Sequence, residues 1–186
     1  TQNDKALYSK NMKAVIEKTK NLDLKQAMAK ELVLENNTVA GIIDHTGFEY
    51  KTRAIVIATG TFLRGMVHIG ASKTAAGRAG EFSSVSLAQN LATLGFNTGR
   101  MKTGTPPRIH ADSIDFSKFD IHKSDHQPKP FSFSTRKIIN PMLPSFMGHT
   151  NKRTHDIIRH NLKHSALYGG HIKGKSARDC PSFEDK

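Results

Sequence analysis

The sequence predicts an α/β fold, and three observations carry that prediction. Residues 54–58 form an apolar run, β-branched at its centre, as is typical of a strand buried on both faces. Thr59 and Gly60 follow it, where a chain can turn sharply and a ligand can approach the backbone. Segments with helical periodicity lie on either side, at residues 4–20 and 83–94. A buried, parallel strand between amphipathic helices indicates an α/β sheet.

The segment before this run predicts one helix followed by a meander of strands. In residues 4–20 lysines cover one face, and the apolar side chains near the other face are Leu7, Met12, Val15 and Ile16. Polarity alternates in residues 24–28, and further strands are expected at 31–35, 38–44 and 48–51. Asn36 and Asn37 suit a hairpin turn, and residues 45–47 suit the next turn.

After the run, residues 65–80 are rich in Gly, Ala and Ser, and we expect a loop there. Ser83 or Ser84 can cap a helix that continues to about Leu94, where Gly95 ends it. The leucines expected to face inward are Leu87, Leu91 and Leu94. A short strand is expected at 96–101.

The last part of the chain has a weaker pattern. Residues 109–147 contain four prolines, and we expect a long, partly ordered excursion with one strand-like alternation at 131–134. A helix is expected from Thr150 or Asn151 to about His164, followed by a turn at 168–170. The side chains expected to bury this helix are Ile157, Ile158 and Leu162.

Composition excludes several classes of protein. The chain has 186 residues, 37% of them hydrophobic, and its single cysteine excludes a disulfide framework. No apolar run approaches the ~18 residues of a membrane span. The net charge is +12, of which residues 1–98 contribute +4 and residues 99–186 contribute +8 with eight of the ten histidines. This charge favours a polyanionic partner such as nucleic acid, bound by the second half, although solubility alone is the plainer explanation.

Two patterns in the second half resemble motifs but have plainer explanations. Residues 169–176 match the spacing of a nucleotide-binding P-loop, yet the segment before them is helical and polar rather than a buried strand. A basic, glycine-containing loop that binds phosphate in another way stays open. His160 and His164 share a helix face with a spacing that can bind zinc, but no third ligand is placed beside them. Exposed histidines are the favoured interpretation, and no metal site is predicted.

Cys180 and a stiff basic turn are the remaining candidates. A lone cysteine is usually a small buried hydrophobe, but Cys180 lies among polar residues, where nearby cations would stabilise a thiolate and nearby acids would oppose it. Arg100, Lys102 and Arg108 flank a Pro-Pro turn, where phosphate could bind through charge. An ordinary basic loop is the alternative, and spacing alone does not decide between the two.

Ordered blocks of the sequence resemble the pattern of the MnmG (GidA) family. They lie at residues 59–65, 67–70, 77–80, 102–108, 149–151, 154–159 and 180–186, with a less clear match at 113–116. In this family a flavin-dependent enzyme works with a GTPase partner, MnmE, to install the carboxymethylaminomethyl group on the wobble uridine of certain tRNAs. The related FAD- and folate-dependent tRNA uracil methyltransferase shares the strand pattern, but residues 180–186, Cys-Pro-Ser-Phe-Glu-Asp-Lys, favour MnmG.

The resemblance implies that the chain is an internal fragment of a longer, homodimeric cytoplasmic enzyme. Residues 1–98 would be the middle of a Rossmann-like FAD-binding domain, and residues 99–186 an inserted mixed α/β domain associated with NADH and tRNA. The glycine-rich FAD fingerprint would precede this segment, and a helical region that contacts tRNA and the GTPase would follow it. A nucleic-acid-binding or structural module with no activity of its own is the alternative.

The resemblance also implies roles for individual residues. Ala29 would contact FAD through its backbone, and Ser84 would contact it at a helix start, where N–H groups favour phosphate. Cys180 matches the reactive cysteine, although the preceding Ser-Ala-Arg-Asp departs from the usual Gly-Pro-Arg-Tyr. The segment associated with NADH comprises Ser176, Ala177, Arg178, Asp179, Cys180, Pro181, Ser182, Phe183, Glu184, Asp185 and Lys186.

The implied chemistry uses two cofactors and a one-carbon donor. NADH reduces FAD, and methylenetetrahydrofolate supplies the carbon that is added to the uracil ring with glycine or ammonium. Cys180 is expected to act as a nucleophile or proton donor. Arg100, Lys102 and Arg108 are expected to bind phosphates of tRNA or NADH.

Overall fold

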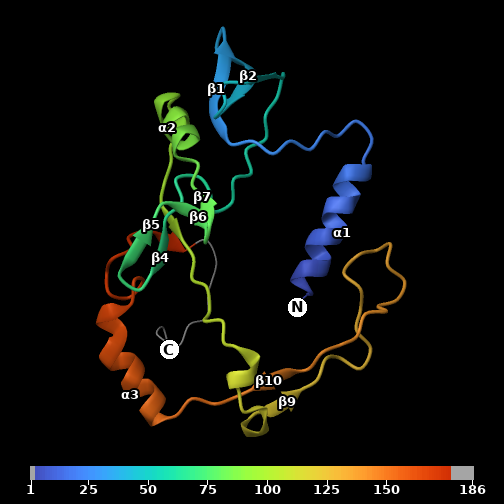
Figure 1. The fold of residues 1–186 in the computed structure, drawn as a ribbon, viewed down its shortest axis with the longest axis vertical. Coiled ribbons are helices and arrows are strands. Elements are labelled where there is room, and N and C mark those ends of the chain that lie inside the picture. Colours follow the sequence, from blue (N-terminus) through green and yellow to red (C-terminus); the bar gives the residue numbers. More distant parts are fainter. Residues whose placement is uncertain (1–2, 177–186) are drawn as a thin grey trace. The chain divides into compact units, whose positions relative to one another are not determined.

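The computed structural model describes residues 3–176, and the chain divides into two compact units, Thr1–Thr98 and Gly99–Lys186 (Figure 1). The fold is mixed α/β, as predicted, and its described strands form small sheets of two or three strands each. The identity of the units as part of a FAD-binding domain and an inserted domain stays a prediction. Within residues 3–176, no helix has the length and hydropathy that crossing a membrane requires.

The first helix is confirmed, but its apolar face is uncovered. Helix α1 (Lys5–Lys18) begins at Asp4, whose carboxylate accepts a hydrogen bond of 2.9 Å from the backbone N–H of Leu7. None of its residues is buried, and Val15 is 57% exposed. The helix therefore owes its form to local hydrogen bonds and its cap rather than to packing.

The predicted meander is confirmed as a three-stranded antiparallel sheet in the order β1-β2-β3. Asn36 and Asn37 have φ angles of 49° and 62°, as a tight hairpin turn between β1 and β2 requires. The alternation in residues 24–28 does not form a strand, so that expectation was wrong. The strands are β1 (Ala29–Glu35), β2 (Thr38–Asp44) and β3 (Glu49–Lys51).

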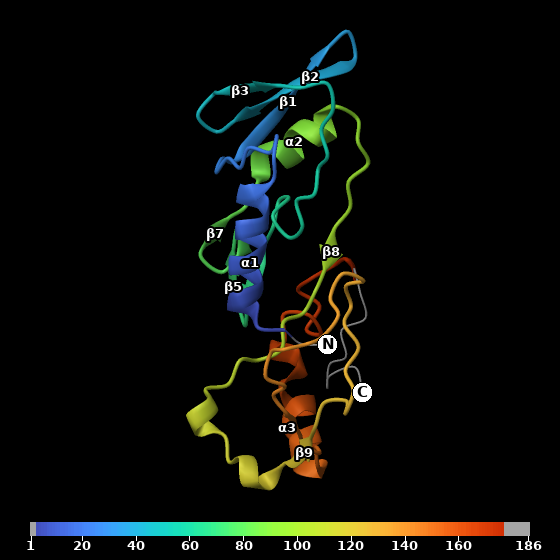
Figure 2. The same ribbon diagram turned by 90° about the vertical axis from the view of Figure 1, so that its right-hand side faces the viewer.

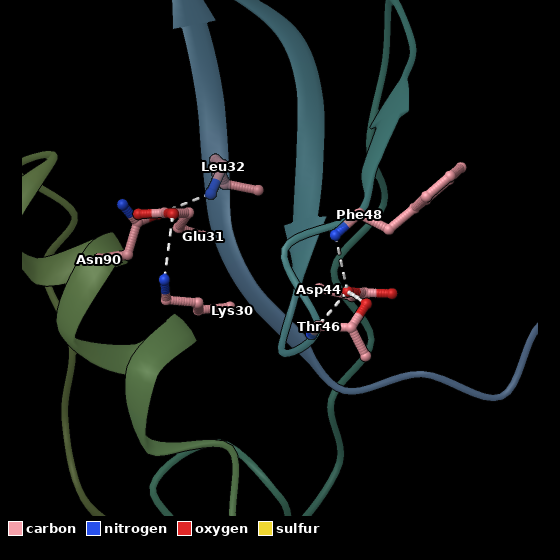
Figure 3. Close-up of polar contacts among 7 residues, drawn as sticks. All are labelled: Lys30, Glu31, Leu32, Asp44, Thr46, Phe48 and Asn90. Carbon is pink, nitrogen blue, oxygen red and sulfur yellow. Dashed lines mark hydrogen bonds and ion pairs between the residues drawn. The ribbon is translucent and has the colours of Figure 1, made fainter.

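The turn between β2 and β3 is organised by the buried carboxylate of Asp44, which is 5% exposed (Figure 3). Its Oδ1 accepts hydrogen bonds from the hydroxyl and the backbone N–H of Thr46, at 2.6 and 2.8 Å, and from the N–H of Phe48 at 3.1 Å. Its Oδ2 accepts from the hydroxyl of Tyr50 at 3.3 Å. The Thr46 hydroxyl, helped by the other donors, holds the pKa of Asp44 below its ordinary value of 3.8, against the opposing effect of burial.

Helix α2 (Val85–Thr93) provides most of the small core of the first unit and lies beside β1 (Figures 1 and 2). Leu87 and Leu91 are 3% and 5% exposed, and Gly95 with φ of 88° follows the helix, as predicted. The side chain of Asn90 accepts a 2.9 Å hydrogen bond from the backbone N–H of Leu32 in β1 (Figure 3).

The expected loop at residues 65–80 is instead a pair of hairpins, so that prediction was wrong. Gly70 and Gly80 adopt φ angles of 56° and 80° in the turns, where other residues would be strained. A Cβ on Gly77 would collide with the ring of Phe62, so small residues permit this close packing. The strands are β4 (Val67–Ile69) with β5 (Ser72–Thr74), and β6 (Ala76–Arg78) with β7 (Glu81–Phe82).

The apolar run at residues 54–58 is not a strand in this structure. Val56 is 92% exposed, and no described strand pairs with the run. A strand needs hydrogen-bonded neighbours, and apolar composition alone does not supply them. The expected strand at 96–101 shrinks to β8 (Met101–Lys102), and residues 131–134 form turns in which the Phe133 side chain is fully exposed.

The second unit has short elements joined by long connections, in agreement with the expected excursion. The rings of Phe116 and Phe146 lie 4.6 Å apart and pack the part that contains β9 and β10. Asn151 caps α3, as predicted, by accepting a 3.0 Å hydrogen bond from the N–H of Thr154. Ile157 is 56% exposed, which corrects the expectation that it buries the helix. The elements are η1 (Ala111–Ser113), η2 (Phe116–Lys118), β9 (Asp120–His122), β10 (Ser145–Met147), α3 (Lys152–Asn161), η3 (Leu162–His164) and β11 (Lys175–Ser176).

We expect replacement of Asp44 by Asn to flatten the acid dependence of stability in the first unit. A carboxyl whose pKa is lowered by folding stabilises the fold above its unfolded value of 3.8, and this contribution is lost as pH falls through the lower folded value. In urea titrations below and above pH 3.8, Asp44→Asn should have a lower midpoint at neutral pH and a shallower fall in acid.

Asp23→Asn is the matched control, because Asp23 is an exposed residue outside any helix or strand. It removes the same charge and should keep the wild-type pH profile. A wild-type profile for Asp44→Asn would show that this carboxylate does not stabilise the turn.

Candidate functional site

The two residues implied to contact FAD lie 55 positions apart in the sequence and meet in the structure. The Ser84 hydroxyl donates a hydrogen bond to the backbone carbonyl of Ala29 at 3.4 Å. Both residues are half-buried, Ala29 at the start of β1 and Ser84 immediately before α2. A distance of 3.4 Å is long for an O–H donor, so the bond is weak and the hydroxyl can turn toward a ligand at small cost.

A cavity of about 220 Å³ lies at the start of β1 and of α2. Its lining residues are Met28, Ala29, Lys30, His45 and Ser86. Lys30 supplies a cation that is paired with Glu31 at 3.5 Å, with about half of its side chain exposed. The cavity is small for a whole dinucleotide and has room for one segment of it, such as a phosphate or a ribose.

The start of α2 is electrostatically suited to an anion. Ser84 occupies the N-cap position, yet its side chain makes no capping hydrogen bond, and the first turn contains no acidic residue. The first N–H groups of any helix have no partner within the helix and carry partial positive charge. The geometry around Ala29 and Ser84 therefore fits a phosphate group placed at the helix start.

The second unit brings together two of the three predicted phosphate-binding cations. Strand β8 pairs in parallel with β11, with Met101 opposite Lys175 and Lys102 opposite Ser176. The backbone N–H of Lys175 donates to the carbonyl of Arg100 at 3.2 Å. Lys102 thus lies opposite Ser176, the first residue of the segment implied to bind NADH, and Arg100 contacts the residue before it.

This strand pair is positively charged and closely packed. Lys102 is half-buried and Lys175 is exposed, and neither forms an ion pair with an acidic side chain of residues 3–176. A Cβ added to Gly174 would lie 2.9 Å from the Arg100 carbonyl oxygen and 3.2 Å from its Cγ. Glycine at this position therefore permits the two backbones to approach.

The other predicted site residues of the second unit do not join the β8–β11 pair. Arg108 is exposed in an irregular stretch, and no described contact joins it to the β8–β11 pair. Residues 169–176 are rejected as a nucleotide P-loop, because turns precede them and β11 forms their end. Within residues 3–176, His160 and His164 are exposed, and no three His, Cys, Asp or Glu side chains are grouped to hold a metal.

The remaining predicted residues lie outside the described part of the chain. These are Ala177, Arg178, Asp179, Cys180, Pro181, Ser182, Phe183, Glu184, Asp185 and Lys186. Sequence reasoning also missed two residues. Asn90 bonds α2 to β1 in the first unit, and Gly174 permits the close approach of backbone at the β8–β11 pair in the second. A polar Asn three positions after Leu87, on the inward face of α2, was the available signal for the first.

Comparison with known proteins confirms the family resemblance. The model of a family described as glucose inhibited division protein A matches residues 1–186. The tRNA uridine 5-carboxymethylaminomethyl modification enzyme MnmG of Thermodesulfovibrio yellowstonii is 51% identical over 185 residues, which cover 100% of this chain and 30% of that protein. The protein of the same name from Syntrophobacter fumaroxidans is 52% identical over 186 residues, 100% of this chain and 29% of that protein.

A solved structure agrees with the sequence relatives. GidA of Aquifex aeolicus, in its form I crystal, matches with a TM-score of 0.82 and 41% identity over 99% of this chain and 32% of that one. The chain thus spans about 30% of the length of these curated relatives.

We expect Gly174→Ala to weaken the β8–β11 pair, because the added Cβ meets the backbone of Arg100. Overpacking of this kind costs about 1–2 kcal/mol, so the Lys175 amide hydrogen should exchange roughly 5- to 30-fold faster. Hydrogen exchange followed by NMR measures this directly.

Gly99→Ala is the control, since a Cβ there meets nothing within 4 Å. It should leave Lys175 exchange unchanged. Equal exchange in wild type and Gly174→Ala would mean that the close approach of these strands does not hold the pair.

Proposed function

The chain belongs to the glucose-inhibited division protein A family, and we propose that it is an internal segment of the enzyme that forms the 5-carboxymethylaminomethyl group on the wobble uridine of tRNA. The observation that carries the proposal is about 50% identity over the whole chain to enzymes named for this modification. The activity of the complete enzyme, its cytoplasmic location, its homodimer and its MnmE GTPase partner all belong to the proposal.

We propose that the first unit contributes to a FAD site. The start of α2 would hold a phosphate through its N–H groups and the Ser84 hydroxyl, and the carbonyl of Ala29 would accept from a ribose or ring donor. The cavity beside them is sized for one segment of the cofactor. FAD, once reduced by NADH, would supply the redox chemistry that transfers the carbon of methylenetetrahydrofolate, and the protein would position it.

We propose that the second unit binds NADH and tRNA phosphates. In the β8–β11 pair Lys102 lies opposite Ser176, where the segment proposed to bind NADH, residues 176–186, begins, and the Arg100 carbonyl accepts from the adjacent Lys175 N–H. A half-buried lysine with no acidic partner among residues 3–176 is suited to a phosphate. Arg108 would act independently, as a further contact to phosphate from its exposed position.

We propose that Cys180 is the catalytic residue, on the basis of the sequence block 180–186. As a thiolate it would attack the uracil ring, or as a thiol it would give a proton to an adduct. Its nucleophilic role needs a deprotonated sulfur, which the nearby cations in the sequence would favour and the adjacent Asp179 would oppose.

In the complete enzyme, Ser84→Ala should weaken FAD binding roughly 5- to 30-fold, which corresponds to the loss of one hydrogen bond to a charged group, about 1–2 kcal/mol. Retention of the flavin absorption band during dialysis measures this. Ser83→Ala is the matched control, because the Ser83 hydroxyl donates to the Phe62 carbonyl instead. Equal FAD retention in both variants would remove Ser84 from the cofactor site.

Cys180→Ser in the complete enzyme should abolish wobble-uridine modification while flavin binding and NADH oxidation persist, because serine is a far weaker nucleophile at neutral pH. Mass spectrometry of digested tRNA measures the modification, and the flavin spectrum reports an intact fold. Wild-type modification by this variant would exclude catalysis by Cys180. Absence of modification by the wild-type enzyme, supplied with MnmE, GTP and the one-carbon donor, would contradict the proposed function itself.

A further inference from the structure

Helix α3 has a solvent-exposed basic face, which none of the proposed roles uses. Lys152 and Arg153 form no ion pair with acidic side chains of residues 3–176. The single acidic residue of α3, Asp156, already pairs with Arg159 at 3.6 Å. The face therefore has uncompensated positive charge.

The position of these cations is unfavourable for the helix itself. Lys152 and Arg153 are the first two residues of α3, and its first turn contains no acidic residue. Cations at a helix start repel the partial positive charge of its N–H groups, where an acidic residue would stabilise it. Residues that destabilise their own helix are expected at sites where they bind a ligand. The summed positive potential at this end suits an anion.

The same face is also partly apolar. It is a largely open surface along one side of the helix, formed by Lys152, Arg153, Asp156, Ile157, His160 and Asn161. Ile157 is 56% exposed there, and His160 is exposed one turn after Asp156. This arrangement suits an unpaired nucleotide. Its anionic phosphate can bind the cations at the start of the helix, and its flat, apolar base can contact the aliphatic and imidazole side chains further along.

We propose that this face of α3 binds a single-stranded loop of RNA, with Lys152 and Arg153 on backbone phosphates and with His160 and Ile157 against an unstacked base. The inference rests on the proposed function in one respect, because it takes tRNA as the polyanion. An acidic protein would be drawn by the same charges but would have no base to place on His160. A duplex would engage the cations while leaving the imidazole and Ile157 unused.

The test is fluorescence anisotropy of the 186-residue chain with a labelled hairpin RNA that carries an anticodon loop with an unmodified wobble uridine. Lys152→Ala with Arg153→Ala should lower affinity roughly tenfold at low salt. The slope of log affinity against log salt should fall by about 1.4–1.8, since each phosphate contact contributes about 0.7–0.9. Circular dichroism should show an unchanged helix content, because the substitution relieves repulsion at the helix start.

His160→Ala should reduce affinity for the hairpin roughly tenfold and leave affinity for a blunt duplex RNA of equal length unchanged, because only the loop offers an unstacked base. Lys10→Ala with Lys18→Ala is the matched control, as it removes the same charge from exposed positions of α1. This control should change hairpin affinity less than twofold.

Three results would overturn the inference. The Lys152→Ala, Arg153→Ala variant could bind the hairpin with wild-type affinity, or the α1 control could lose as much hairpin affinity as that variant. Polyglutamate could also compete with the labelled hairpin as effectively as unlabelled hairpin does. In each of these the chain binds RNA or another polyanion, and the proposed enzymatic function is untouched. Failure of the wild-type chain to bind the hairpin would overturn the inference and remove support for tRNA contact by this segment. The proposed function would still be tested separately, by tRNA modification with the complete enzyme.

Discussion

One hydrogen bond joins helix α2 to the edge of the three-stranded sheet in the first unit. Strand β1 pairs with β2 on one side, and on the other side its Leu32 N–H would lack a partner if Asn90 of α2 did not accept it. The bond joins residues 58 positions apart, with Leu87 and Leu91 buried beside it. The contact lies near the place where Ala29, the first residue of β1, meets Ser84, the N-cap of α2.

The two candidate sites are built in the same way. In each, a hydrogen bond to a backbone carbonyl joins segments that are distant in the sequence, and this contact positions the side chains of those segments. At the start of α2 the contact is between Ser84 and the Ala29 carbonyl, and in the second unit it is between the Lys175 N–H and the Arg100 carbonyl. Neither contact involves a catalytic group. Under the proposed function, both sites would bind and orient a phosphate-containing ligand, and the reactive chemistry would come from the ligand and from Cys180.

The sequence was sufficient where structure is local and insufficient where it depends on distant pairing. The Asn36-Asn37 turn, the cap at Asn151 and the inward leucines of α2 were predictable, because each is determined within a few residues. The hairpins at residues 67–82 were missed because small residues have weak periodicity and their strands are held by backbone contacts. The meeting of Ser84 with Ala29 was likewise beyond prediction, since no local pattern encodes a contact across 55 residues.

Both units expose apolar side chains, and the second unit also has the larger excess of positive charge. In the first unit the exposed residues include apolar ones such as Val56 and Val15, at 92% and 57%, and burying apolar surface against protein is what stabilises such segments. The chain spans about 30% of its curated relatives, so we infer that elements of the longer protein pair with residues 54–58 and cover α1. In the second unit Lys152, Arg153 and Lys175 are exposed cations with no acidic partner among residues 3–176, and protein core cannot cover unpaired charge without a large desolvation cost. Under the proposed function, phosphates of nucleic acid or of a dinucleotide would supply the negative charge that these cations lack.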